Sequence, residues 1–268
     1  PMDSPSKLYC KWVKNVSLPF WMSKGWNSQK GGWYERLTAD GMPDYSAISR
    51  TRVQARQIIA LSQAIDIGYL PQTTKTRLLD SLEWWWQRAW SVDGAPGFCH
   101  SLHPNGVAAD LKRDCYDHAF SMLALIWAYR ATQDNQILSM LEQVKDFMAE
   151  NMTHSKGGFV EFLIPLKGSA QGYSFQESHG HRRQNPHMHL FEANIAGLRV
   201  VKDGQLKQRF LADATACLEL FNAYFYDSEQ HCIIEHFDES WSPATSQETR
   251  RIEPGHCVEW VWLLHDAS

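Results

Sequence analysis

The sequence lacks the features that define several large classes of protein. No apolar stretch is long enough to cross a bilayer, and none near the start resembles a signal peptide. No Lys/Arg cluster interrupts the balance of 26 basic against 30 acidic residues, so there is no electrostatic footprint for nucleic acid. The six cysteines form no CxxC pair and no zinc-finger spacing. We therefore expect a cytoplasmic protein with reduced thiols and with no membrane or nucleic-acid partner.

Tryptophan and histidine are abundant instead, with 12 of each in 268 residues. Tryptophan stacks on sugar faces and histidine titrates near neutrality, so both suit a carbohydrate site. A Trp ring is also common in a hydrophobic core. The chain has no long low-complexity stretch or linker, and we expect one domain over residues 1–268.

Four short segments recur along the chain at similar spacings. They read GGWYERL at 31–37, GFCHSL at 97–102, GGFVEFL at 157–163 and HCIIEHF at 231–237. Counting from Trp33 to Phe98, Phe159 and Ile233 gives spacings of 65, 61 and 74 residues, and we call these four the marker residues. Each segment is typical of a short strand beside a turn, and the period indicates a repeat architecture.

Pairs of helical patterns lie between the marker residues. The predicted pairs cover residues 49–67 with 73–90, 114–132 with 135–151, and 186–201 with 205–226; one helix precedes the first marker and another spans 254–265. Short connections make the paired helices antiparallel. The expected fold is all-α: an α/α toroid of helix hairpins, of the (α/α)6-barrel type, with short β-hairpins in the loops. Because both ends fall in mid-repeat, we expect an incomplete ring with an exposed apolar flank. Residues 165–184 are expected to form one extended loop.

Polar residues recur in the opening turns of the first helix of each pair and of the last helix. They are Arg52 and Arg56; Tyr116, Asp117 and His118; Asn185, His189 and Glu192; and His256 and Glu259. Taken singly, each also fits a solvated face, a helix start or a satisfied core histidine. Together, on helices that line the inside of a ring, they supply acid–base groups and hydrogen-bond donors around one cavity, which suits a polyol ligand.

A metal site is not expected. His187, His189, His256 and Glu259 contain suitable atoms for zinc. However, His187 and His189 are two residues apart on a helix and therefore point to different faces. The sequence has no HExxH motif. We predict no metal and no cofactor, with His187 directed away from the site.

Four motifs resemble those of the N-acylglucosamine 2-epimerase superfamily, which includes mannose isomerases, cellobiose 2-epimerases and sulfoquinovose isomerase. They are RVQARQ at 52–57, YDHAF at 116–120, NPHMHLFEA at 185–193 and EPGHCVEW at 253–260. The last two are specific together, and the matches run in order over nearly the whole chain.

The resemblance implies a twelve-helix toroid and metal-independent proton transfer next to the carbonyl of a ring-opened sugar. Carried over by position, His256 resembles a catalytic histidine, Glu259 its carboxylate partner, and Arg56 the arginine that stabilises the enediolate. Tyr116, Asn185 and His189 resemble groups that bind hydroxyls or help to open the ring. We add His189 to the catalytic candidates, and Arg52 and Glu192 to the substrate-binding ones. The family's second catalytic histidine lies on a later helix, so we expect it to be absent before Ser268.

These observations favour an aldose–ketose isomerase that converts a mannose-type sugar into a fructose-type sugar. A sugar 2-epimerase is the alternative, since it differs only in where the proton returns. A glycoside hydrolase or lyase on the same fold would need two carboxylates, for which Glu192 and Glu259 are the candidates. A non-catalytic carbohydrate-binding fragment is a further alternative. A small sugar is the expected ligand, and a homodimer is left open.

Overall fold

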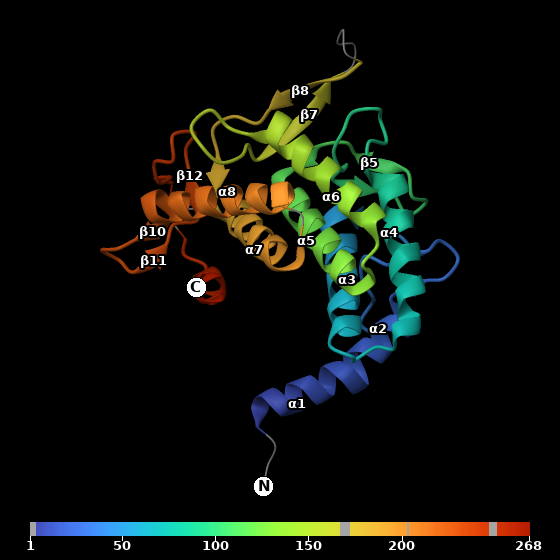
Figure 1. The fold of residues 1–268 in the computed structure, drawn as a ribbon. Coiled ribbons are helices and arrows are strands. Elements are labelled where there is room, and N and C mark those ends of the chain that lie inside the picture. The colour runs from blue at the N-terminus through green and yellow to red at the C-terminus, as the bar shows by residue number, and fades with distance from the viewer. Residues whose placement is uncertain (1–3, 167–171, 203, 247–250) are drawn as a thin grey trace.

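Helix hairpins follow one another in an arc in the computed structural model, which describes residues 4–166, 172–202, 204–246 and 251–268 (Figure 1). The inner helices, packed in sequence against one another, are α3 (Thr51–Asp66), α5 (Cys115–Thr132), α7 (Gln184–Val200) and α9 (Pro254–Ala267). Their outer partners are α4 (Lys75–Ala89), α6 (Asn135–Phe147) and α8 (Gly204–Leu220). Single π-helical turns prolong α6 (η3, Met148–Met152) and α8 (η4, Phe221–Phe225), and the 3-10 turn η2 (Gln72–Thr74) precedes α4. The predicted α/α architecture is confirmed.

A further helical segment precedes the first marker residue, as expected. It consists of α1 (Pro5–Trp12), η1 (Val13–Ser17) and α2 (Leu18–Lys24), and it extends away from one end of the arc (Figure 1). Its exposed apolar side chains are Leu8, Tyr9, Trp12, Val16 and Phe20. At the other end of the arc, α9 exposes Val258, Val261 and Trp262. The expected apolar flank is therefore present at both ends.

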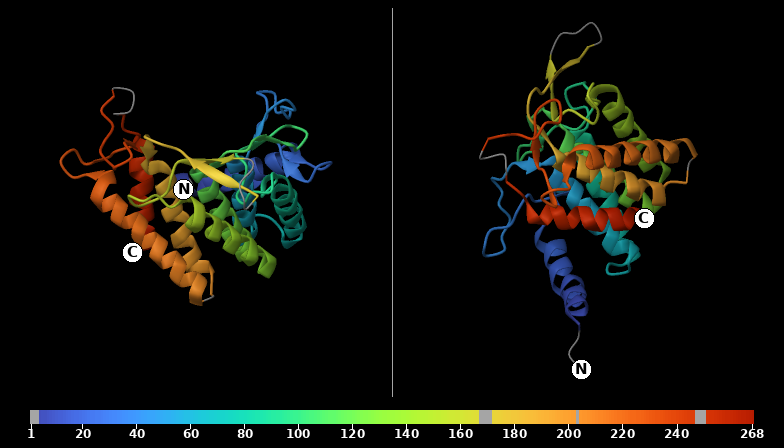
Figure 2. Two further views of the ribbon diagram at one scale, coloured as in Figure 1. Left: turned by 90° about the horizontal axis from the view of Figure 1, so that it is seen from above. Right: turned by 90° about the vertical axis from the view of Figure 1, so that its left-hand side faces the viewer.

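The strands and long loops gather at one end of the helices (Figure 2). Two hairpins are β1 (Trp26–Asn27) with β2 (Gly32–Trp33) and β10 (Tyr226–Asp227) with β11 (Cys232–Ile233). The other sheets are β3 (Ser49–Arg50) with β4 (Ser101–Leu102) and β5 (Ala108–Asp110), β6 (Arg113–Asp114) with β7 (Phe162–Leu166) and β8 (Ser174–Glu177), and β9 (Arg182–Arg183) with β12 (His236–Phe237). All pairs are antiparallel. The pairs β3–β4, β6–β7 and β9–β12 share one arrangement. In each pair the first strand leads into an inner helix, and the second lies in the loop that follows the outer helix of the same hairpin. This pairing gathers the N-terminal ends of the inner helices at the strand end of the molecule.

The prediction of one extended loop over residues 165–184 is wrong for its described part. Strands β7 and β8 form a hairpin whose register runs from Leu163 opposite Glu177 to Leu166 opposite Ser174. The continuous apolar run FLIPL of β7 favours a strand, with Pro165 towards its end. Residues 167–171 lie outside the described part of the chain.

Helix α5 is the most buried element of the inner row. Its N-cap Asp114 accepts a hydrogen bond from the backbone of Asp117, and Gln133 ends the helix in a left-handed conformation with φ of 59°. Such caps satisfy backbone groups that a helix end leaves unpaired. Alanines 119, 124 and 128 are fully buried and keep the helix narrow between its neighbours. The packing around α5 therefore fixes the first turn, where Tyr116 and Asp117 lie.

Within the described residues, no helix combines the length and apolarity that crossing a membrane requires. All six cysteines are free. Burial raises the pKa of Cys99 and of Cys217 to about 12, which keeps these thiols protonated and unreactive at neutral pH.

Candidate active site

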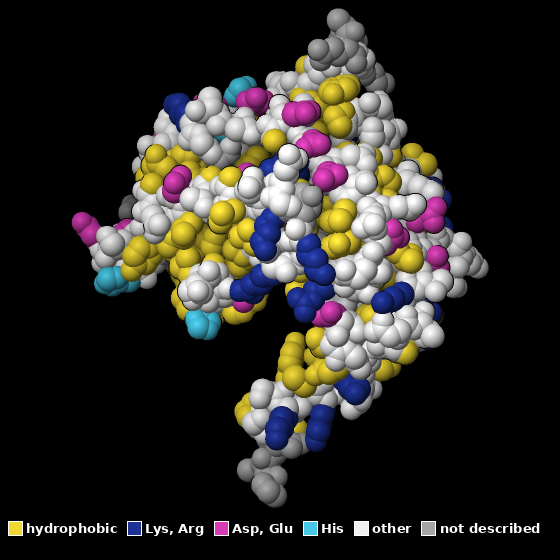
Figure 3. All heavy atoms as spheres, in the orientation of Figure 1, with side chains coloured by type: hydrophobic (Ala, Val, Ile, Leu, Met, Phe, Trp, Pro, Cys, Tyr) yellow, Lys and Arg dark blue, Asp and Glu magenta, His cyan; other side chains and the backbone are white. Residues whose placement is uncertain are grey.

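The inner helices place side chains at two equivalent depths on the concave side of the arc. We count positions from the N-cap residues Arg50, Asp114, Arg183 and Glu253. The second-position layer contains Arg52, Tyr116, Asn185 and Gly255. The sixth-position layer contains Arg56, Phe120, His189 and Glu259. Six of these eight positions are predicted site residues, and along the same concave side Lys and Arg side chains gather (Figure 3).

Contacts join the sixth-position layer from α3 to α9. The guanidinium carbon of Arg56 lies 4.1 Å from the ring centroid of Phe120, which is 4.4 Å from the ring of His189. His189 Nδ1 lies 2.9 Å from Glu192 Oε2 and 3.9 Å from Glu259 Oε1. A cation, a histidine and two carboxylates therefore share one continuous surface.

Tyr116 connects the two layers. Its hydroxyl accepts a 2.8 Å hydrogen bond from Arg56 Nη2, and its ring stands perpendicular to that of His189 at 5.1 Å between centroids. The guanidinium of Arg52 lies 5.6 Å from the Tyr116 ring centroid. Burial raises the pKa of Tyr116, so it remains a neutral hydrogen-bonding group at neutral pH. Near it in this layer, the buried Oδ1 of Asn185 accepts no hydrogen bond from any described residue.

The carboxylate partner of His256 is Glu235, and the predicted pairing with Glu259 is corrected. His256 Nδ1 lies 3.0 and 2.9 Å from the two carboxylate oxygens of Glu235. Glu259, one turn further along α9, approaches His189 instead. Because a carboxylate can only accept, we assign the proton to Nδ1, which leaves Nε2 as the basic atom.

Gln184 fixes the position of Glu235. Its side-chain nitrogen donates to Glu235 Oε2 at 3.0 Å, and its backbone N–H donates to the Glu235 carbonyl at 3.1 Å. The side-chain oxygen of Gln184 in turn accepts a 2.7 Å bond from the buried indole of Trp260. The carboxylate is 4% exposed whereas His256 is 24% exposed. The dyad thus has a buried carboxylate, held by Gln184, and a histidine that reaches the surface of the site.

Sequence reasoning missed Glu235, although a signal for it was present. Glu235 stands two residues after the marker Ile233, and Glu35 and Glu161 stand two residues after Trp33 and Phe159. Glu35 and Glu161 accept hydrogen bonds from the backbone N–H and side-chain Nε of the N-cap arginines of α3 and α7. The repeated carboxylate position therefore faces the start of an inner helix.

His187 is directed away from the site, as predicted. Its Nε2 accepts a 3.0 Å bond from the backbone N–H of Phe159, and its Nδ1 contacts the Arg183 carbonyl at 3.0 Å. His118 repeats this arrangement with the backbone of Phe98 and Asp114. A Cβ on Gly158, which has φ of +70°, would lie 2.6 Å from His187 Nε2, so glycine is required beside this histidine. These two histidines hold the marker loops to the inner helices.

We expect His187→Gln to reduce the loss of stability in acid. Burial lowers the pKa of His187 to about 3, against about 6.5 in an unfolded chain. This contribution to stability is complete above about pH 6.5 and is lost as pH falls towards the folded value, by about 1.4 kcal/mol per pH unit. Glutamine does not titrate, and Gln54 accepts the equivalent bond from Trp33 in the first repeat. Urea unfolding at pH 7 and pH 5 would measure the difference; an unchanged pH dependence would contradict a neutral buried His187.

Among the described residues, two groups of side chains each offer three metal-ligand atoms within 4.8 Å of one another. They are His189, Glu192 and Glu259, and His100, Asp114 and Asp117. In each group a histidine Nδ1 already contacts a carboxylate oxygen. Protein cations also approach the second group, with Arg52 Nη1 3.3 Å from Asp117 and Lys112 Nζ 3.9 Å from Asp114. In the second group these cations therefore offset the charge of the carboxylates.

Two solved structures superpose on this chain over nearly its whole length. A cellobiose 2-epimerase from Bacillus thermoamylovorans superposes with a TM-score of 0.82 at 20% identity, covering 97% of this chain and 65% of that one. A D-mannose isomerase superposes with a TM-score of 0.78 at 20% identity, covering 98% and 65%. At these identities the likeness defines the fold, an α/α toroid.

The chain belongs to the N-acylglucosamine 2-epimerase (GlcNAc 2-epimerase) family, whose model matches residues 32–268. A mannose-6-phosphate isomerase of Rhizobium meliloti is 29% identical over 94% of this chain and 61% of the relative. A cellobiose 2-epimerase of Bacteroides fragilis is 25% identical over 94% of this chain and 62% of the relative. The chain thus spans about three fifths of the length of these relatives.

Proposed function

We propose that the protein carrying this chain is an aldose–ketose isomerase that converts a mannose-type sugar into a fructose-type sugar through an enediolate. The observation that carries the proposal is the His256–Glu235 dyad. His256 lies in the first turn of α9, the same inner helix whose Glu259 approaches His189. Family membership supports chemistry at a sugar carbonyl, and the relatives named above include both isomerases and 2-epimerases.

His256 Nε2 acts as the base in this proposal. It removes the proton from C2 of the open-chain aldose, and the electron pair forms the C1–C2 double bond of the enediolate. The proton returns to C1, while the C2 hydroxyl loses its proton and O1 gains one, so the ketose is an isomer of the aldose. Glu235 holds the Nδ1–H tautomer and stabilises the imidazolium that forms.

The two layers supply the remaining functions. Arg56 faces the developing charge on the enediolate oxygens, and Tyr116 and Asn185 hydrogen-bond to hydroxyls, with Arg52 beside them. His189, held between Glu192 and Glu259, exchanges the proton that ring opening requires. These roles are proposals that rest on the contacts between the layers.

A glycoside hydrolase is less well supported. Ligand oxygens of Glu192 and Glu259 lie within 4.8 Å of each other and of His189 Nδ1. Inverting hydrolases separate their carboxyls by about 6.5–9.5 Å and retaining ones by about 5–5.5 Å with the glycosidic bond between them. With His189 between them, the two glutamates are better suited to contacting this histidine than to flanking a glycosidic bond.

Incubation with mannose in deuterated water tests the proposed reaction. After exhaustive chelation, we expect deuterium on C1 of the ketose, observed by NMR, because the base exchanges its proton with solvent. Deuterium on C2 of an epimer would instead support the 2-epimerase. Absence of any product from mannose and related aldoses would leave the carbohydrate-binding alternative, and loss of turnover with chelator and its rescue by zinc would contradict the metal-free mechanism.

A further inference from the structure

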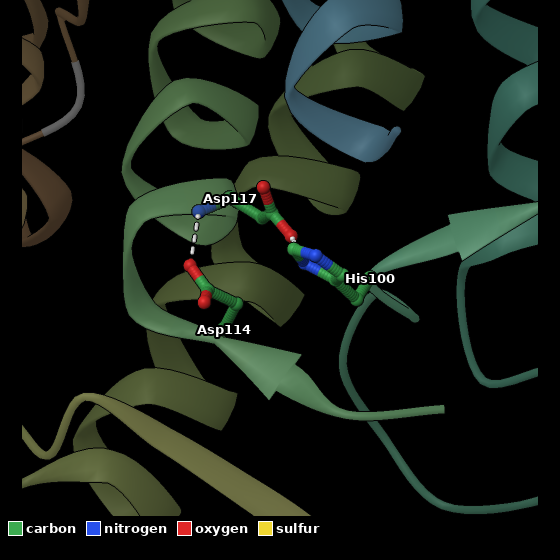
Figure 4. Close-up of side chains that lie close together, drawn as sticks. All are labelled: His100, Asp114 and Asp117. Atoms are coloured by element: carbon green, nitrogen blue, oxygen red, sulfur yellow. Dashed lines mark hydrogen bonds and ion pairs between the residues drawn. The ribbon is translucent and has the colours of Figure 1, made fainter. Parts of the chain in front are cut away.

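A second histidine–carboxylate pair lies at the first turn of α5. His100 Nδ1 is 2.5 Å from Asp117 Oδ2, and Asp117 Oδ1 is 3.3 Å from Arg52 Nη1. Figure 4 shows His100 reaching Asp117 from the neighbouring loop, while Asp114 bonds to the backbone of Asp117. The Asp117 side chain is fully buried, whereas Arg52 is 24% exposed. The carboxylate therefore ties a partly exposed guanidinium to the protein interior.

This pair occupies the same repeat positions as His256 and Glu235, with the residue types exchanged. His100 and Glu235 both stand two residues after a marker residue. Asp117 and His256 both stand three residues after an N-cap. In the first and third repeats the residue two positions after the marker is a glutamate, Glu35 or Glu161, that braces an N-cap arginine. The second and fourth repeats thus share a helix-start dyad that the others lack.

We propose that Asp117 and His100 are positioning residues that hold Arg52 beside Tyr116 and so set the affinity for the sugar. The inference rests on the proposed function, because Tyr116 is placed there as a hydroxyl-binding group. His100 occupies Oδ2, which leaves Oδ1 directed at Arg52. Burial raises the pKa of Asp117 to about 6, so the carboxylate depends on both neighbours to stay ionised at neutral pH.

The placement of Arg52 explains why the contact between Asp117 and Arg52 affects sugar binding. Arg52 and Arg56 both lie within 6 Å of the Tyr116 ring centroid, at 5.6 and 5.8 Å. Arg56 donates a hydrogen bond to the Tyr116 hydroxyl, whereas the side-chain hydrogen bond of Arg52 to a described residue is the one to Asp117. Loss of the Asp117 carboxylate therefore releases Arg52 from the Tyr116 ring and leaves Arg56 in place.

The test compares Asp117→Asn and His100→Gln with Arg52→Ala and the double variant Asp117→Asn/Arg52→Ala. Calorimetry measures binding of mannitol, an unreactive open-chain polyol, and steady-state kinetics measures kcat and KM for the aldose. We expect Asp117→Asn to weaken mannitol binding and raise KM roughly tenfold, because charged hydrogen bonds contribute at this level, with kcat changed less than about threefold. The double variant should bind as Arg52→Ala does, since Asp117 acts through Arg52. His100→Gln, at a less buried position, should raise KM in the same direction.

Glu35→Gln is the matched control, because Glu35 has the equivalent position in the first repeat and braces Arg50. Its mannitol affinity should be unchanged. Additive losses in the double variant, equal losses in Glu35→Gln, or a fall in kcat at constant KM would each overturn the positioning role. Mannitol binding that follows the expected order without turnover of any aldose would support the positioning role while the proposed reaction fails. If Asp117→Asn does not fold, normal mannitol affinity in folded His100→Gln would overturn the inference.

Discussion

Replacement of His256 by alanine is expected to lower kcat roughly 10²–10⁴-fold, the contribution of a well-placed general base. The side chain is partly exposed, and Glu235 keeps its hydrogen bonds to Gln184 when the imidazole is removed. We therefore expect the free energy of unfolding to change by less than about 2 kcal/mol. Initial rates and urea unfolding of the same preparations check both parts. A variant that unfolds would show that His256 has a structural role, and a folded variant that keeps its rate would show that His256 is not the base.

Glu235→Gln is expected to lower kcat by about 10²-fold or more, with a smaller effect on KM. An amide in place of the carboxylate can donate to Nδ1 of His256, which favours the tautomer whose Nε2 carries the proton and cannot act as a base. The change is isosteric, so the bond to Gln184 can be retained. Steady-state kinetics at neutral pH measures the effect.

The comparison with Glu259→Gln and Glu35→Gln makes this prediction specific. If Glu259 were the partner of His256, as the family resemblance implied, Glu259→Gln would cause the larger loss. We expect Glu235→Gln to cause the larger loss, and Glu35→Gln, at the equivalent position of the first repeat, to leave kcat unchanged. The reverse order would contradict the dyad.

Helix bounds and the faces to which helical residues point could be predicted from the sequence. Helical periodicity defined α5 to within one residue at its start, because its ends carry Asp114 as a cap and Gln133 as a left-handed stop. The same spacing separated His187 from His189, and the structure places the first against Phe159 and the second beside Tyr116. Both results depend only on the geometry of one helix.

Contacts between a loop and a helix could not be predicted in this way. The family resemblance implied that Glu259, on the same helix, is the partner of His256, yet Glu235 reaches His256 from the strand-bearing loop. That contact depends on the pairing of β12 with β9, which aligns the loop with Gln184 at the start of α7. The hairpin formed by β7 and β8 was missed for a similar reason, since the partner of each strand lies outside its own pattern.

A crystal structure of the protein with bound mannitol tests the central claim most directly. The measured quantity is the distance from His256 Nε2 to C2 of the polyol. We expect about 3–3.5 Å, the separation of atoms poised to react, with Glu235 on Nδ1 and Arg56 against the oxygens on C1 and C2. A polyol bound between Arg56 and His189 with His256 Nε2 turned away from C2 would contradict the assignment of His256 as the base.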